Sequence, residues 1–488
     1  MSQVIVATVN CKKRLYASTA DELAAIAPNI PMGLLVSYLA HKGVPVELID
    51  SDVENIPVRE LVQAVIAKRP KLLCLVASGA NPSASTMSMV GILDFFKEFN
   101  VEPEAKGITT AIWGPHPTVL PERTLAETGA DYVIRGEGYE TIAGLYESLI
   151  KGKGAGAVMG LSWMKGGKYF ETEPPALVDV DSLPMIDWSR MNPARYRAHN
   201  WHCFGDIGNR TPYAIVWTSM GCPYACNFCC INNLFGKRTY RMRSIDNVIA
   251  EIDVLVNDYG IKNIKILDEL FIIKHPRIEE FCARLEERNY GLNMWCFARV
   301  DTVTPEILKR LKKVGMNWVA YGFESVNHKV LENSKKRYSL DLMKDVIKWS
   351  VDAGVYICAD AIFGLWDDDM DSMNATKEFL FKHNFEWINI YPAFAFPGTE
   401  LYDEYIRQGV IQTPKTWDRY SLYGYECECL PTKYLAPAEV LKFRDDVFSE
   451  YFTRPEFLKM IDGKFGAMTR EHCENMTKIK LKRRILGD

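Results

Sequence analysis

The sequence lacks any apolar run of about 18 residues or more, the length that a membrane-spanning helix needs, so we expect no membrane insertion. Its first residues, MSQVIVATVNCKKR, lack the basic region, apolar core and cleavage site of a signal peptide. It also has little excess charge, with 58 basic against 62 acidic residues, and its one basic block is the short run 478–484. We therefore expect a cytoplasmic protein that acts on a small molecule and binds neither nucleic acid nor a membrane.

The cysteines do not form the spacing pattern of a secreted disulfide framework. The chain has 13 of them, and most stand singly inside apolar runs such as Leu73-Cys74-Leu75. This pattern is typical of a reducing compartment. The exception is the group Cys222, Cys226, Cys229 and Cys230.

With 488 residues the chain has room for two or three domains. Over residues 1–148, short β-branched runs alternate with helical patterns, which predicts an α/β fold with a doubly wound, Rossmann-like parallel sheet. Ligands of such sheets lie beyond the carboxyl ends of the strands, so the loops 78–86 and 114–118 are candidate binding loops. The expected strands are 4–8, 45–49, 71–77, 110–113 and 132–135.

A second α/β unit follows a connector. Residues 149–210 contain a predicted hairpin, 158–164 with 169–173, and a proline-bearing stretch. Alternation resumes over residues 211–405 and predicts a partial (βα)6 barrel, whereas residues 406–488 are predicted to be mostly helical. The expected barrel strands are 213–219, 263–267, 293–298, 317–322, 355–361 and 387–391.

The first barrel strand ends in a loop with three cysteines spaced C-x3-C-x2-C: Cys222, Cys226 and Cys229. Such a loop can wrap three thiolates around an iron–sulfur cluster, and three ligands on a four-iron cube leave one iron open for chemistry. The alternative is zinc or a set of structural thiols, but zinc fingers bring their ligands in two pairs, and no matching second pair lies at that spacing. Cys230 is interpreted as a packed neighbour.

Residues 213–400, through this motif, resemble the radical S-adenosylmethionine (SAM) superfamily. The resemblance implies a [4Fe-4S] cluster whose open iron binds SAM, and cleavage of SAM to a 5'-deoxyadenosyl radical. Phe228 matches the aromatic residue that precedes the third cysteine and lies near SAM. Asp268 and Glu269 end the second barrel strand, where many members carry Gly-Gly-Glu, so only the acidic character carries over. A solvated strand cap is the alternative interpretation of both.

Two further residues are candidates for SAM binding by the same resemblance. Glu324, in Gly-Phe-Glu-Ser, matches the glutamate that commonly meets the ribose hydroxyls. Arg299 is a candidate for the methionine carboxylate because a guanidinium group matches carboxylate geometry. Arg299 can instead form a structural ion pair with Asp301 or Glu324.

A doubly wound domain placed before such a barrel resembles the B12-binding class of radical SAM proteins. That class includes carbon and phosphorus methylases, a porphyrin ring cyclase and a ring-contracting enzyme. The motifs are Gly-Pro-His-Pro-Thr after the fourth strand, at 114–118, and Arg-Gly-Glu-Gly after the fifth, at 135–138. The residues expected to hold cobalamin are Ser78, Asn81, Ser83, Ser85, Thr86 and Gly114.

The same loops allow an interpretation without cobalamin. Trp113 stands where the class usually has a glycine, and its indole could block the nucleotide tail. The hydroxyl-rich loop also fits a helix N-terminus capped by Ser85. His116 is expected to be a loop or interface residue rather than a cobalt ligand.

The leading hypothesis is a radical SAM enzyme that uses cobalamin to transfer a methyl group to an unactivated carbon of a small metabolite. A reductase, or a flavodoxin- or ferredoxin-type protein, would supply the electron. The alternative omits cobalamin and dehydrates, epimerises or oxidises a sugar or polyol, because residues 430–435 and 439–445 resemble members of sugar and antibiotic pathways, including an aminoglycoside dehydratase.

A third possibility, a non-catalytic cobalamin sensor, would not need the three-cysteine loop. No catalytic acid or base is predicted. Polar groups near predicted barrel ends or in the tail are Asp360, Asp367, Tyr391, Tyr423 and Tyr425. Such residues more often serve packing or capping.

Overall fold

The N-terminal sheet consists largely of parallel strands close to the predicted ones. The computed structural model describes residues 4–16, 24–79 and 81–488, and within them this sheet has seven strands in the order β2-β1-β3-β4-β5-β6-β7. The order reverses between β1 and β3, as in other doubly wound folds, so the predicted α/β class is confirmed. The parallel strands are β1 Val4–Ala7, β2 Val46–Ile49, β3 Leu72–Val76, β4 Thr109–Trp113 and β5 Tyr132–Ile134.

The hairpin that we expected in the connector belongs to this sheet. Strands β6 (Leu161–Lys165) and β7 (Lys168–Glu171) pair antiparallel, and β6 also pairs antiparallel with β5. Leu161 is fully buried opposite Ile134, so the hairpin extends the core and covers an edge that β5 would otherwise expose.

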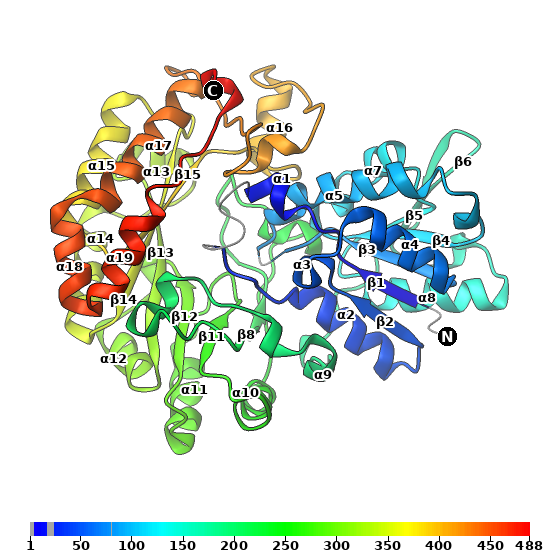
Figure 1. Ribbon diagram of the computed structural model, residues 1–488, viewed down its shortest axis with the longest axis horizontal. Coiled ribbons are helices and arrows are strands. Elements are labelled where there is room, and N and C mark those ends of the chain that lie inside the picture. Colours follow the sequence, from blue (N-terminus) through cyan, green and yellow to red (C-terminus); the bar gives the residue numbers. More distant parts are fainter. Residues whose placement is uncertain (1–3, 17–23, 80) are drawn as a thin grey trace.

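Helices cover both faces of the N-terminal sheet (Figure 1). Because side chains alternate along a strand, Val4 and Val6 pack in the cluster that includes α2 and α8, whereas Ile5 and Ala7 pack with α4 and α5. The helices are α1 Lys12–Tyr16, α2 Ile30–His41, α3 Ser51–Glu54, α4 Val58–Lys68, α5 Ala84–Phe99, α6 Pro115–Val119, α7 Pro121–Thr128 and α8 Tyr139–Lys151.

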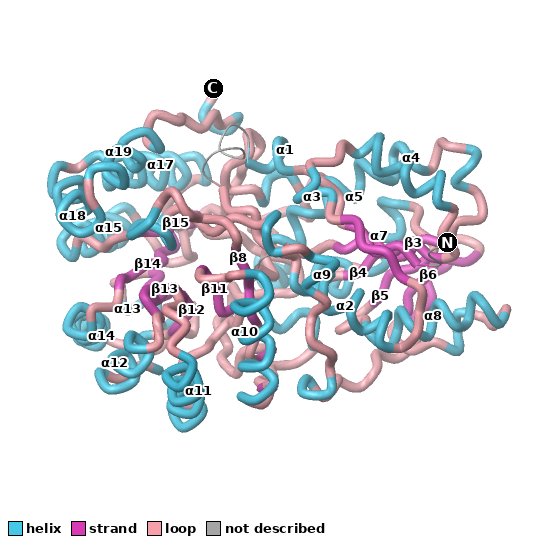
Figure 2. The backbone as a smooth tube through the Cα atoms, turned by 60° about the horizontal axis from the view of Figure 1, so that its bottom comes forward, coloured by secondary structure: helices cyan, strands magenta, loops and turns pink. Residues whose placement is uncertain are grey.

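The second unit is an open barrel beside the first sheet (Figures 1 and 2). Within residues 213–392, all of them described, six parallel strands follow the order β15-β14-β13-β12-β11-β8, so each strand pairs with its neighbours in sequence. The partial barrel is therefore confirmed. Its strands are β8 Tyr213–Val216, β11 Asn263–Ile266, β12 Asn293–Ala298, β13 Met316–Glu324, β14 Tyr356–Phe363 and β15 Trp387–Pro392.

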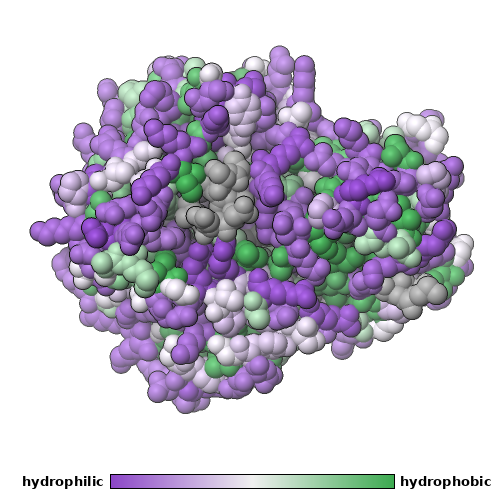
Figure 3. All heavy atoms as spheres, viewed as in Figure 1, coloured by the Kyte–Doolittle hydropathy of each residue, from purple (hydrophilic) through white to green (hydrophobic). Residues whose placement is uncertain are grey.

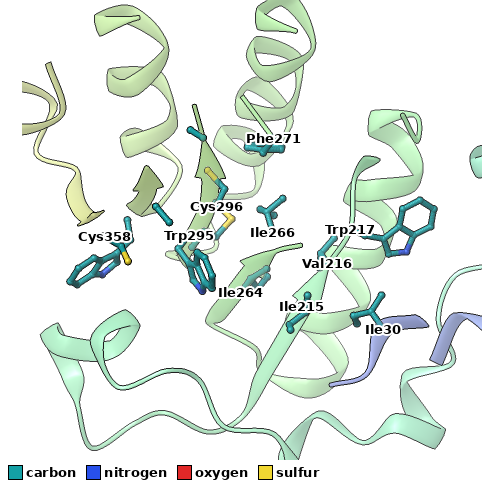
Figure 4. Close-up of a cluster of buried hydrophobic side chains, with 14 of the residues drawn as sticks. Ile30, Ile215, Val216, Trp217, Ile264, Ile266, Phe271, Trp295, Cys296 and Cys358 are labelled. Atoms are coloured by element: carbon teal, nitrogen blue, oxygen red, sulfur yellow. The ribbon is translucent and has the colours of Figure 1, made fainter. Parts of the chain in front are cut away.

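Helices pack on the outside of the barrel, and apolar side chains fill the space between them and the strands. Figure 4 shows buried side chains from three adjacent strands, Ile215, Ile264 and Trp295, of which Trp295 lies on the inner face of the barrel. The same buried cluster includes Ile30 of α2 and Trp217 after β8, so the two units share an apolar contact. The barrel helices are α10 Ile245–Tyr259, α11 His275–Arg288, α12 Pro305–Lys313, α13 His328–Asn333, α14 Leu340–Ala353 and α15 Met370–His383.

The C-terminal part is mostly helical, as predicted, and its first loops reach back to the N-terminal domain. Trp417 is 1% exposed and inserts there: its indole N–H donates to Glu127 at 2.9 Å, and Arg123 lies 4.1 Å from the ring centroid. The His116 ring meets Trp417 edge-on at 4.4 Å. The remaining helices are α9 Trp188–Met191, α16 Glu400–Arg407, α17 Pro437–Thr453, α18 Pro455–Phe465 and α19 Ala467–Met476.

The surface seen in Figure 3 is mainly hydrophilic, with smaller apolar areas over the N-terminal domain. Among the described residues, no helix has both the length and the apolar character to cross a membrane.

Replacing Trp417 with alanine should destabilise the protein by about 3–5 kcal/mol, the usual cost of removing a buried tryptophan. The measurement is urea denaturation of the full chain. The control is Trp163→Ala, because Trp163 is only partly buried on the β6 strand and stacks on Phe170. A Trp417→Ala variant that is no less stable than the Trp163→Ala variant would show that this contact does not hold the two parts together.

Candidate functional site

A cavity of about 1240 Å³ lies between the N-terminal sheet and the open barrel. The N-terminal wall comes from the loops that follow β1, β3 and β4, at the carboxyl ends of those strands. The opposite wall comes from the inner face of the barrel and from the loop 221–240, which contains the cysteines. Ligands held by either unit would therefore share one space.

The cysteine loop is closed at its base by a short antiparallel ladder. Strand β9 (Ser219–Met220) pairs with β10 (Arg241–Met242) on the far side of the loop. Gly221 has a φ of +87°, and a Cβ there would lie 2.4 Å from the carbonyl oxygen of Thr239. The glycine before the first cysteine is thus required by the close approach of the two ends of the loop.

A buried carboxylate fixes the entry to the loop. Asp268, 1% exposed after β11, accepts hydrogen bonds from the Thr218 amide (2.5 Å), the Thr218 hydroxyl (2.6 Å) and the Ser219 hydroxyl (2.6 Å). Arg277 in turn donates to the Thr218 carbonyl at 3.0 Å. Asp268 therefore ties the end of β11 to the start of the cysteine loop and does not face the cavity.

Two asparagines directly after the cysteines hold the loop from within. Asn232 donates to the carbonyl of Cys222 at 2.9 Å and accepts from its amide at 3.3 Å, which closes a ring around the first cysteine. Asn233 donates to the carbonyl of Pro397 at 2.8 Å and so joins the loop to the turn after β15. Their spacing carries no familiar motif, so sequence reasoning missed both.

Cys222, Cys226 and Cys229 are all partly exposed and line the cavity, and Cys230 also borders the cavity but is buried. Among the described residues, no group of three His, Cys, Asp or Glu side chains converges tightly enough for a single metal ion. A four-iron cube separates its sulfur ligands more widely than one ion does, so three thiols spread over one loop fit a cluster. Burial raises the pKa of the Cys229 thiol well above its usual value, and a bound metal reverses this by stabilising the thiolate.

The two acidic residues after β11 have different surroundings. Glu269 lines the cavity, and burial, with the neighbouring Asp268 charge, raises its pKa to about 7, although the Gly221 amide acts in the opposite direction. Glu269 therefore can meet a ligand beside the cysteine loop, whereas the Asp268 carboxylate is used within the protein. The sequence alone did not separate the two.

Glu324 also lines the cavity and is held in an unusual backbone conformation. Its φ is +60°, in the left-handed region, at an irregularity in the pairing of β13 with β14. The buried Lys336 ammonium forms an ion pair with Glu324 and donates to the Gly322 carbonyl at 3.1 Å. Backbone strain of this kind costs about 1–3 kcal/mol and is typical of functional positions.

Arg299 lies against the cysteine loop but is already engaged. It donates to both carboxylate oxygens of Asp301, at 2.9 and 2.8 Å, and stacks on Tyr224 with its guanidinium 3.8 Å from the ring centroid. Its remaining terminal nitrogen lies 3.7 Å from the Cys226 sulfur. The structural ion pair with Asp301 that we considered is present, so only part of the guanidinium could meet a SAM carboxylate.

The remaining predicted residues divide into two groups. Phe228, Ser78, Asn81, Ser83 and Gly114 line the cavity.

Ser85 and Thr86 turn inward instead. Ser85 donates to the Ala77 carbonyl and accepts from the His116 amide at 2.9 Å, and Thr86 lies 3.3 Å from the His116 ring. Helix α5 begins one residue before Ser85, so Ser85 is not its cap.

Trp113 and His116 both follow or end β4, but only Trp113 faces the cavity where cobalamin would bind. The Trp113 indole lines the cavity and donates to the Gly136 carbonyl at 2.9 Å, which holds the ring against the end of β5. His116 is 2% exposed, and burial lowers its pKa to about 3, so it is a neutral interface residue against Trp417.

Gly114 has a φ of +150°, and a Cβ there would lie 2.0 Å from the Ala77 carbonyl oxygen. Close packing of β3 against β4 therefore accounts for this glycine.

Comparison with known families identifies both units. Residues 218–380 match the radical SAM superfamily, and residues 18–146 match the B12 binding domain. The chain combines a radical SAM domain with a B12-binding domain. The resemblance read from the cysteine motif and the doubly wound domain is thus confirmed, as are the three cofactors it implied: a [4Fe-4S] cluster, SAM and cobalamin.

Similarity to curated relatives extends over most of the chain. An uncharacterized methyltransferase of Pyrococcus horikoshii is 26% identical over 437 residues, 88% of this chain and 89% of that protein. An anaerobic magnesium-protoporphyrin IX monomethyl ester cyclase of Cereibacter sphaeroides is 27% identical over 351 residues, 69% of this chain and 53% of that protein.

A solved structure shares the fold. The radical SAM methyltransferase TsrM of Kitasatospora setae, with tryptophan and a SAM analogue bound, superposes with a TM-score of 0.71 at 14% identity, and covers 98% of this chain and 99% of that one.

Replacing Cys222, Cys226 or Cys229 with alanine should remove nearly all cluster iron, because two thiolates cannot hold the cube. Iron and sulfide analysis with the visible spectrum of anaerobically reconstituted protein measures this. Cys230→Ala is the matched control, since Cys230 is adjacent but buried, and should keep its iron. Iron retained in the three variants, or lost equally in the control, would overturn the ligand assignment.

Asp268→Asn and Glu269→Gln should impair different properties of the protein. Asp268→Asn places an amide N–H against two hydroxyl donors, a mismatch of about 1–3 kcal/mol that should lower both stability and cluster yield. Glu269→Gln should keep both and weaken SAM binding about tenfold, as expected for loss of a hydrogen bond to a charged group. Thermal unfolding, iron content and equilibrium SAM binding test the pair. The same phenotype in both variants would contradict the division of roles.

Proposed function

We propose that this protein is a cobalamin-dependent radical SAM methyltransferase that methylates an unactivated carbon of a small-molecule substrate. The observation that carries the proposal is the shared cavity: its walls include the three cysteines of the radical SAM domain and the loops after β3 and β4 of the B12-binding domain. SAM, cobalamin and substrate can therefore meet without domain separation. The methyltransferase relative, which matches 88% of this chain, supports methyl transfer.

Residues of the radical SAM domain would hold the cluster and bind SAM. Cys222, Cys226 and Cys229, which line the cavity, would hold the cluster, and Phe228, which also lines it, would lie near SAM. When bound, the cluster supplies the electron that cleaves SAM, and cobalamin supplies the methyl group. A reductase, or a flavodoxin- or ferredoxin-type protein, is the proposed electron source.

Glu269 and Glu324 both line the cavity, so SAM's amino group and ribose hydroxyls have acceptors there. The backbone of Glu324 and its ion pair orient that carboxylate before SAM arrives. In the B12-binding domain, Ser78, Asn81 and Ser83 present polar groups for cobalamin.

Methyl transfer predicts a distinctive set of products. Reconstituted protein with SAM carrying a labelled methyl group, reductant and a panel of hydroxyl- and amine-bearing metabolites should release S-adenosylhomocysteine, 5'-deoxyadenosine and methionine, and one metabolite should gain the labelled methyl. Liquid chromatography with mass spectrometry measures all four. Protein prepared without cobalamin, and the Cys226→Ala variant, are the controls.

Other products would indicate other functions. Deoxyadenosine and methionine without S-adenosylhomocysteine would contradict methylation and favour radical dehydration, epimerisation or oxidation of a sugar or polyol. No SAM cleavage in a protein that binds cobalamin would favour a sensor.

A further inference from the structure

The inner face of the barrel contains a polar pair that the SAM and cobalamin assignments do not use. Asp360 of β14 and Asn389 of β15 are partners in the parallel ladder, and both line the cavity. Side chains alternate along a strand, so residues 358, 360 and 362 share the inner face with 387, 389 and 391. The pair therefore projects from rigid strands into the barrel.

One oxygen of Asp360 is fixed by the protein. Asn389 donates to Oδ1 of Asp360 at 2.8 Å, and the Trp387 indole N–H donates to the Asn389 amide oxygen at 2.9 Å, which sets the orientation of that amide. The Cys358 thiol lies 3.7 Å from the same Oδ1. Among the described residues, no hydrogen bond reaches Oδ2 of Asp360. Its second oxygen is thus available on the cavity side.

Burial makes the charged form of the Asp360 carboxyl unfavourable unless a hydrogen-bond donor reaches it. Burial raises the pKa of Asp360 to about 7, although the Asn389 hydrogen bond acts in the opposite direction. A hydrogen-bond donor at Oδ2 would stabilise the carboxylate form. Glu324 of β13 and Lys336, in the loop between α13 and α14, already pair with each other.

The walls around the pair are aromatic. Trp295 and Phe297 of β12 face the cavity, and the Lys265 ammonium lies 4.8 and 5.1 Å from their ring centroids. Trp387 and Tyr391 lie on the same face as Asn389. Flat or apolar faces of a ligand pack well on such rings, while a fixed carboxylate selects its polar group.

We propose that Asp360 and Asn389 form the substrate-recognition site of the barrel, and that the substrate presents a hydroxyl or N–H donor to Oδ2 of Asp360 while an apolar face packs on the aromatic walls. The inference rests on the proposed function only in that the ligand of this site is the substrate. Asp360 is a binding residue in this account, and Asn389 positions it.

Matched probes that differ only in the donor test the proposal. Phenol is compared with anisole for the hydroxyl donor, and indole with 1-methylindole for the N–H donor. Dissociation constants are measured by ligand-observed NMR on reconstituted protein with SAM and no reductant, so no methyl transfer enters the result. We expect at least one donor-bearing probe to bind about tenfold more tightly than its blocked partner, because a buried carboxylate rejects an analogue without the donor.

Asp360→Asn should abolish that preference while keeping the hydrogen bond from Asn389, because the variant keeps Oδ1 as an acceptor and places N–H donors where Oδ2 was. Asp258→Leu, at an exposed position on α10, is the control and should keep the preference. Equal binding within both pairs, or a preference that survives in Asp360→Asn, would overturn the proposal. If the preference holds but no methylated product forms, the recognition site stands and the proposed reaction is wrong.

Discussion

The reactive end of the barrel depends on one buried carboxylate. Asp268 holds the amide and hydroxyl of Thr218 and the hydroxyl of Ser219, and so fixes the point at which the first barrel strand becomes the cysteine loop. The β9–β10 ladder then closes the base of the loop, and Asn232 closes a ring around its first cysteine. These contacts fix the cysteine loop within the protein, so the three thiols can face the cavity before any cluster binds.

The second constraint is that the two domains are held as neighbours. The buried apolar cluster continues from α2 into β8, and Trp417 inserts from the C-terminal part into the N-terminal domain. These contacts between the two domains therefore maintain the cavity that lies between them. Because parallel strands present their carboxyl ends at one edge, each domain contributes its ligand-binding loops to the same space.

Much of the architecture could be predicted because hydrophobic periodicity is a local signal: the parallel strands of both sheets lie within a few residues of the expected positions. The pairing of the 161–171 hairpin with β5 could not be predicted, because the sequence of a hairpin does not show which sheet edge it joins. Within the site, the sequence does not distinguish two adjacent acidic residues, yet Asp268 accepts hydrogen bonds from the start of the cysteine loop and Glu269 faces the cavity. Asn389 and Lys265 went unnoticed because single polar residues inside strands carry no motif.

The central claim is that the cluster keeps one iron open toward the shared cavity. Electron paramagnetic resonance of the reduced, reconstituted protein, recorded with and without SAM, tests it most directly. The account predicts that SAM changes the spectrum of the [4Fe-4S]⁺ cluster, because the nucleotide binds the iron that no cysteine holds. A spectrum unchanged at saturating SAM would show a cluster fully ligated by the protein, and would contradict the account.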